Sequence, residues 1–236
     1  MKFIRKGGPP HDYSIWCRAV AGTAKADYRE LPKNLRTKLL CSLLTEQGWI
    51  CAYTMKRLEA GNSHVEHIKA ESLCRAENPE SDLDYGNLVA CFPSDGMKKQ
   101  YRYGAQAKGN WWENDGRDFI SPLHGSCEAR FFFDTKGNIN AVNRGQAAKR
   151  TIEVLGLDHP TLTEDRRNVI QEFIYGEHRD DPLSEANALA AVTTICQRTA
   201  DRGFHEFCIA IRDALAEHVQ IIRKLARKRR FARAAQ

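Results

Sequence analysis

Long apolar runs are missing from this sequence of 236 residues. A membrane-spanning helix needs roughly 20 consecutive apolar residues, and no segment approaches that length. The N-terminal segment carries basic residues but no apolar stretch of the kind found in secretory signals. We therefore expect a cytoplasmic protein that does not bind membranes.

Cysteine pairs at zinc-binding spacing are also missing. The chain has 8 cysteines, but it contains no CxxC pair, so local spacing does not indicate a four-cysteine zinc site. Without a secretory signal, these cysteines are expected to be reduced. We therefore expect no structural zinc.

Acidic residues are missing from the basic tail, residues 223–233, which holds seven basic residues. The whole chain has a net charge of +6, so the remainder carries −1. Such a concentration of charge is expected of an arm that contacts phosphates or an acidic partner. A solvated helix end is the alternative, because basic residues favour helix C-termini. The candidate nucleic-acid-binding residues of the tail are Arg227, Lys228, Arg229 and Arg230.

Apolar spacing predicts helices near both ends of the chain. Residues 34–47 place five leucines at helical intervals, and Gly48 follows as a stop. Thr163 is a candidate N-cap and Gly176 a stop for one of the C-terminal helices. The helical segments expected in that region are 147–157, 162–176, 184–201 and 204–230.

Two hairpins are expected in the first part of the chain. Residues 49–54 and 63–68 are β-prone, and Gly61-Asn62 lies between them as a turn signal. Residues 129–135 and 138–142 flank a Lys-Gly-Asn turn in the same way.

The rest of the first part is expected to be irregular. Residues 69–84 and 92–117 have the composition of loops, and 85–91 has that of a buried turn or short helix. The predicted architecture is α+β. It has a mixed N-terminal region with a helical extension (1–143) and an all-helical C-terminal region (144–236).

The stretch HVEHI, residues 64–68, carries the residue types of a hydrolytic site. A neutral histidine can act as a general base, and a carboxylate can hold a divalent ion. His64 and Glu66 share strand parity, so we expect them on one face. Glu66 and His67 converge on one site only if the strand ends at this motif.

The ordered set WICAYT, HVEHI, DYGNLVAC, AKGN, ISPL and ARFFFDTKGNI resembles the PtuB-like family of HNH endonucleases. The resemblance covers residues 1–166. It implies a ββα-metal nuclease core with flanking helices. Members of that family are bacterial anti-phage effectors found beside the ABC-type ATPase PtuA in Septu systems and in some retrons.

The resemblance implies roles for four residues. Glu66 would be the metal ligand and His67 the general base. Asn87 would hold the loop that orients His67, because an amide side chain can bond two backbone segments at once. His64 would support the site, or it is a solvated strand residue.

The family pattern is incomplete in this chain. Ala105 stands at the position of the third motif residue, and an alanine cannot bind metal. Asp95, three residues before Lys98, is the candidate replacement, and its oxygen suits Mg²⁺ or Mn²⁺. Thr54 replaces the second cysteine of the family's CxYC.

These features predict a metal-dependent endonuclease that hydrolyses phosphodiester bonds of DNA or of structured RNA such as tRNA. Lys108 and Lys98 are candidates for contacting phosphate. The resemblance also implies partners, namely a PtuA-like ABC-type ATPase and a retron reverse transcriptase with its RNA–DNA hybrid. The alternative, favoured by Ala105 and Thr54, is a catalytically degraded scaffold subunit of the defence complex.

Overall fold

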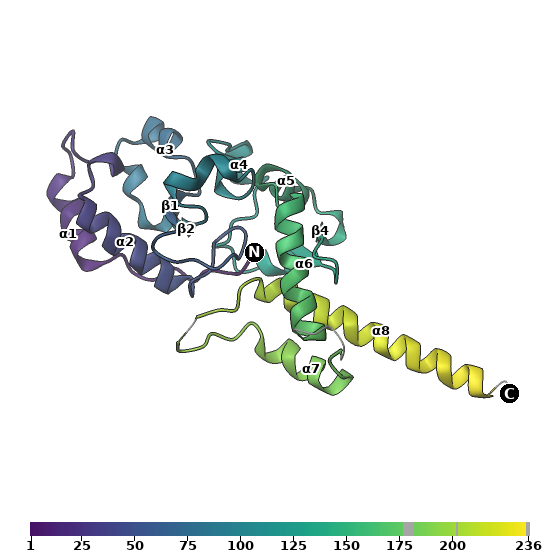
Figure 1. Ribbon diagram of the computed structural model, residues 1–236. Coiled ribbons are helices and arrows are strands. Elements are labelled where there is room, and N and C mark those ends of the chain that lie inside the picture. Colours follow the sequence, from purple (N-terminus) through teal and green to yellow (C-terminus); the bar gives the residue numbers. More distant parts are fainter. Residues whose placement is uncertain (177–181, 202, 235–236) are drawn as a thin grey trace.

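The computed structural model describes residues 1–176, 182–201 and 203–234, with the backbone alone described at 95, 98, 99, 233 and 234. The chain forms an α+β architecture of helices and two small antiparallel strand pairs (Figure 1). The helices are α1 His11–Val20, α2 Lys33–Glu46, α3 Glu71–Glu77, α4 Ala105–Lys108, α5 Gln146–Leu155, α6 Pro160–Tyr175, α7 Glu185–Thr194 and α8 Cys208–Ala234. The strands are β1 His64–His67, β2 Leu88–Cys91, β3 Phe131–Phe133 and β4 Ile139–Ala141.

One hydrophobic core joins the N-terminal and C-terminal parts of the chain. Leu39 and Leu43 of α2, Val89 of β2, and Ile209 and Leu215 of α8 are all fully buried in it. α8 packs against α7, α6 and β3 over its first half. Burial of this apolar surface is the main force holding the helical region against the strand pairs.

The second half of α8 leaves the body of the protein. Figure 1 shows this helix extending away from the other elements toward the C-terminus. Val219 is its last buried residue, and Leu225 and Phe231 are 51% and 76% exposed. No described helix is long and apolar enough to span a lipid bilayer.

Apolar periodicity predicts the long helices correctly. The segment 34–47 coincides with α2, and the four segments of the C-terminal region contain α5 to α8. The predicted helix 184–201 is too long, because α7 ends at Thr194 and an isolated bridge from Thr199 to Gly203 follows. Gly156 and Gly176 follow their helices with positive φ, a conformation that glycine adopts without steric cost. The second predicted hairpin is also confirmed, as β3 and β4.

The first predicted hairpin is wrong. Residues 49–54 form a turn with one isolated bridge, from Ile50 to Arg57, and Met55 has a positive φ that ends any extended run. β1 pairs instead with β2, more than twenty residues further along the chain. Residues 85–91 therefore contain a short 3₁₀ turn, Tyr85–Asn87, followed by a strand.

The segments expected to be loops contain short helices. α3 lies within residues 69–84 and α4 within 92–117, both too short to show a clear apolar period. Thr163 is not the N-cap of α6. The helix begins one turn earlier, and His159 accepts a hydrogen bond from the Thr161 amide.

Candidate functional site

Strand β1 presents two different faces. It pairs with β2 from His64 to His67, and the amide of Ile68 still donates to the carbonyl of Asn87 at 2.9 Å. Because strand side chains alternate, His64 and Glu66 lie on one face and His67 on the other. β1 ends at His67, within this motif, but its last two side chains still alternate, so Glu66 and His67 point to opposite faces.

His67 is held in one orientation. Its Nε2 lies 2.9 Å from the carbonyl oxygen of Asp82, and its ring meets that of Tyr28 edge-on at 4.9 Å. A carbonyl oxygen only accepts hydrogen bonds, so Nε2 carries the proton in this contact. The neutral ring then has its lone pair on Nδ1, which is the form required of a general base.

Asn87 braces the chain just beyond His67. Its Oδ1 accepts from the Lys69 amide at 2.8 Å, and its Nδ2 donates to the Lys69 carbonyl at 2.9 Å. Both of these backbone bonds go to one residue, so the amide side chain holds the loop of Asn87 against Lys69. Since Lys69 lies two residues after His67, this amide fixes the path of the chain that carries the imidazole.

The opposite face of β1 holds a buried ionic cluster. Glu66 Oε1 lies 3.0 Å from Lys108 Nζ, and Glu66 Oε2 lies 3.6 Å from His64 Nε2. Burial opposes ionisation of Glu66, but the contact with His64 and the charge of Lys108 outweigh it, so its pKa is lowered. The shared face predicted for His64 and Glu66 is confirmed by this contact.

Lys108 is not a surface lysine. Its side chain is fully buried, and besides Glu66 its ammonium donates to the carbonyls of His67 at 3.1 Å and Gly109 at 3.4 Å. The expected external phosphate contact is therefore not available in this conformation. The ammonium of Lys108 instead links α4 to β1 through these contacts.

The remaining predicted residues lie apart from β1 or outside the description. The side chains of Asp95 and Lys98 are not among those that the structure describes. The four basic residues of the tail lie exposed on the projecting part of α8. They are Arg227, Lys228, Arg229 and Arg230.

An acidic cluster lies on the His67 side of β1. One carboxylate oxygen from each of Asp27, Glu71 and Asp82 falls within 4.8 Å of the others, a spacing that could hold a metal ion. Asp82 is fully buried, its Oδ1 has no hydrogen-bond partner, and burial raises its pKa. Arg75 lies 2.9 Å from Asp27 and already supplies positive charge to this cluster, as does Arg29.

A second donor set lies on the Glu66 face. His64 Nδ1 contacts the Pro93 carbonyl at 2.5 Å, which leaves Nε2 unprotonated in the neutral ring. That Nε2 is buried without a hydrogen-bond partner, and it faces Glu66 Oε2. An orphaned imidazole nitrogen beside a carboxylate fits a divalent ion, although Lys108 competes for the other carboxylate oxygen.

Cys51 and Cys91 lie together beneath this face. Both are buried, and Cys51 Sγ accepts a hydrogen bond from the Phe92 amide at 3.4 Å. Burial opposes ionisation, but hydrogen bonds from Cys91 and Thr54 lower the pKa of Cys51 to about 6. The two thiols thus have hydrogen-bond partners within the protein.

The chain matches no protein-family model. It is 32% identical over 155 residues to a protein of Vibrio cholerae serotype O1 biovar El Tor named "Retron Vc95 putative HNH endonuclease". The matched part is 63% of this chain and 69% of the relative. This chain belongs to the same HNH endonuclease family. Endonuclease chemistry is thus the framework in which the His67 and Glu66 faces are interpreted.

Sequence reasoning missed the groups that surround His67. Asp82 orients the ring through its backbone carbonyl, and a carbonyl leaves no signature in the sequence. Tyr28 and Asp27 come from a segment far from the motif. The run Asp-Leu-Asp just before Tyr85 was a visible signal, since acidic residues close to an HNH histidine are candidate metal ligands.

Proposed function

We propose that the protein is a metal-dependent HNH endonuclease of a retron-associated anti-phage system. The observation that carries this proposal is the contact of His67 Nε2 with the Asp82 carbonyl, in a chain of the HNH endonuclease family. That contact selects the tautomer with an open Nδ1. His67 would then take a proton from the water that attacks the phosphodiester.

The residues around His67 would keep this base in place. Asn87 holds the backbone beyond it, and Tyr28 limits rotation of the ring. A positioned base of this kind accelerates proton transfer by typically about 10²–10⁴-fold. Its side chain is 7% exposed, so the base operates in a largely water-poor setting.

A bound Mg²⁺ or Mn²⁺ would stabilise the charge that develops on the phosphate and the leaving oxygen. Glu66 Oε2 and the orphaned His64 Nε2 would hold such an ion, with Asp95 as the further ligand expected from the family pattern. The Asp27, Glu71 and Asp82 cluster is the competing set, and it has the merit of lying on the His67 face.

The family and its retron-associated relative also support proposals for the partners and the substrate. We place the protein beside a PtuA-like ABC-type ATPase, as in Septu systems, and beside a retron reverse transcriptase with its RNA–DNA hybrid. The substrate is DNA or a structured RNA such as tRNA. HNH hydrolysis needs no 2′-hydroxyl and tolerates one.

A nuclease assay that compares wild type with the His67→Ala variant tests the enzyme proposal. Wild type should cut plasmid DNA or tRNA in the presence of Mg²⁺ or Mn²⁺, and His67→Ala should not. His124→Ala is the matched control, because that histidine is exposed and its ring forms hydrogen bonds only with Ser126 among the described residues. Equal cleavage by wild type and His67→Ala would refute the proposed role.

Metal titration of two further variants decides between the donor sets. Glu66→Gln should raise the Mg²⁺ concentration needed for half-maximal cleavage if the Glu66 face holds the ion. Asp82→Asn should do so if the acidic cluster holds it. The two variants keep side-chain size, so a difference between them reports on charge.

A second candidate function is that of a non-catalytic scaffold subunit. The observation that favours it is the buried ammonium of Lys108, which bonds Glu66 and two backbone carbonyls. A cation built into the protein would occupy part of the position that a metal ion needs. In that case neither wild type nor Lys108→Met cleaves nucleic acid, while assembly with partners persists.

A further inference from the structure

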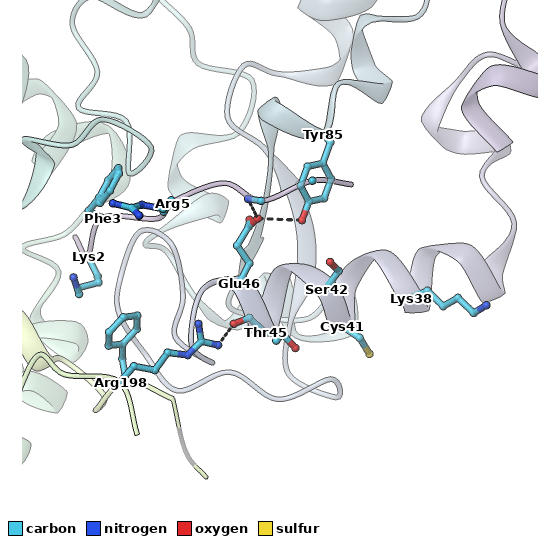
Figure 2. A pocket seen from close by; sticks show the side chains of 13 residues that line it. Lys2, Phe3, Arg5, Lys38, Cys41, Ser42, Thr45, Glu46, Tyr85 and Arg198 are labelled. Atoms are coloured by element: carbon cyan, nitrogen blue, oxygen red, sulfur yellow. Dashed lines mark hydrogen bonds between the residues drawn. The ribbon is translucent and has the colours of Figure 1, made fainter. Parts of the chain in front are cut away.

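A groove on the surface is lined largely by cations and aromatic rings. Its main cavity, of about 850 Å³, lies between the N-terminal segment, α2 and the loop before α8 (Figure 2). A second cavity of about 650 Å³ adjoins it, because both are lined by Gly7 and Tyr85. The charged and aromatic residues of the main cavity include Lys2, Phe3, Arg5, Lys38, Arg198 and Phe204.

The groove carries an excess of positive charge. Arg5 is exposed and has no hydrogen-bond or ion-pair partner among the residues that the structure describes. Arg18 adds another exposed cation in the second cavity. The carboxylate of Glu46 is already neutralised, since Lys6 lies 2.8 Å away and the Gly7 amide donates to it.

Aromatic rings lie between these cations. Phe3 and Phe204 are both partly exposed in the main cavity, and Tyr85 sits at the junction of the two cavities. Alternation of cations with exposed rings is the arrangement that holds single strands, because cations track the phosphates and rings stack on the bases. An acidic peptide would use the cations but has no need of the rings.

The groove is connected to the strand that carries His67. Lys6 Nζ donates to the carbonyl of Leu88 at 3.0 Å, and Leu88 is the partner of His67 across the β1–β2 pair. Leu83 lines the second cavity and directly follows Asp82, whose carbonyl orients the His67 ring. Backbone contacts therefore join the groove to the β1–β2 pair, although His67 itself lines neither cavity.

We propose that this groove binds single-stranded nucleic acid and leads it to the β1–β2 pair. The proposal rests on the proposed nuclease function and names the form of nucleic acid that enters the protein. Neither Lys108 nor the basic tail is needed for it. The phosphates contact Arg5 and Arg18, and the bases stack on Phe3 and Phe204.

Equilibrium binding of a labelled oligothymidine, measured by fluorescence anisotropy in EDTA, tests the groove separately from cleavage. Arg5→Ala/Arg18→Ala should weaken binding at least tenfold. It should also lower the slope of log affinity against log salt by about 1.4, because about 0.7 is lost for each phosphate contact to a single strand. Arg130→Ala/Lys149→Ala, which removes two exposed cations outside the groove, should change neither quantity.

The ring contacts have a separate test. Phe3→Leu removes the aromatic surface with little loss of apolar bulk, and it should weaken binding severalfold, whereas Phe3→Tyr should restore it. Circular dichroism melting confirms that each variant is folded. Binding equal to wild type in both the arginine pair and Phe3→Leu would overturn the proposal.

Two further outcomes distinguish single-strand binding by the groove from protein docking and from the nuclease proposal. If the groove variants lose binding of a labelled polyglutamate peptide and keep the oligothymidine, the groove is a protein-docking site and the proposal fails. If wild type binds oligothymidine through the groove but cuts no nucleic acid, the groove is supported and the nuclease proposal fails.

Discussion

The two faces of β1 differ in how their charges are satisfied. On one face, His67 receives its orientation from a backbone carbonyl and an aromatic edge. On the other face, Glu66 is ionised and paired with the buried ammonium of Lys108. An oriented imidazole whose Nδ1 is open can accept a proton, whereas a buried ion pair is costly to disturb. We infer that the first face supplies the candidate base, whereas the candidate metal-binding groups of the second face are held in place by a buried ion pair.

Replacing His67 or His64 singly by glutamine should give the largest difference in kcat between the two faces of β1. His67→Gln should lower kcat for nucleic-acid cleavage by about 10²–10⁴-fold, because glutamine cannot accept the proton from water. His64→Gln, on the opposite face, should lower kcat by less than His67→Gln. Steady-state cleavage at saturating metal measures both, and a larger loss for His64→Gln would reverse the assignment of the faces.

Removing the buried cation should affect stability more than any other change on the Glu66 face. Lys108→Met leaves the Glu66 carboxylate unpaired and should lower the free energy of unfolding by about 3–5 kcal/mol. Urea denaturation measures this loss. Lys149→Met, at an exposed position of α5, should stay within about 0.5 kcal/mol of wild type.

A double variant sharpens the same comparison. Lys108→Met/Glu66→Gln removes both charges together, so it should be more stable than Lys108→Met alone. No recovery in the double variant would mean that the packing of the lysine stem, and not the ion pair, supports this face.

Truncating Asn87, which holds the chain beyond His67, should have an intermediate effect on the free energy of unfolding. Asn87→Ala removes two hydrogen bonds to the Lys69 backbone and should cost about 1–3 kcal/mol. Asn87→Asp keeps the acceptor and loses the donor, so its loss should be smaller. Urea denaturation gives the stability, and kcat should fall with it because the chain carrying the imidazole is no longer fixed.

The pH dependence of stability should have opposite signs on the two faces, although each effect is small. The pKa of Glu66 is lowered by folding, so its contribution is present above the usual value near 4.5 and is lost as the pH falls below it. The pKa of Asp82 is raised, so protonation relieves a penalty as the pH falls through its folded value. Unfolding curves of Glu66→Gln and Asp82→Asn against wild type across this acid range measure the two signs.

Local sequence patterns predict the long helices of this protein well, and the short helices and the strand pairing poorly. The leucine spacing of residues 34–47 gives α2, because one buried stripe is enough to define a helix. The partner of β1 could not be found in this way. The turn signal at Gly61-Asn62 lies next to a β-prone run, whereas the true partner, β2, lies beyond α3.

The candidate site was predictable only where its residues stand in local sequence motifs. His67 and Asn87 stand in family motifs, and the bracing contact follows from the chemistry of an amide side chain. The Asp82 carbonyl and the buried position of Lys108 depend on long-range packing. Neither leaves a pattern at any sequence spacing.

The part of α8 beyond Val219 also sets a length scale. Residues 220–234 continue the helix, and at 1.5 Å per residue they extend roughly 22 Å past the last buried contact. In the proposed function a short oligonucleotide would fill the groove without reaching this extension, whereas a longer one would contact both. We therefore expect affinity for nucleic acid to rise in two steps as the ligand lengthens.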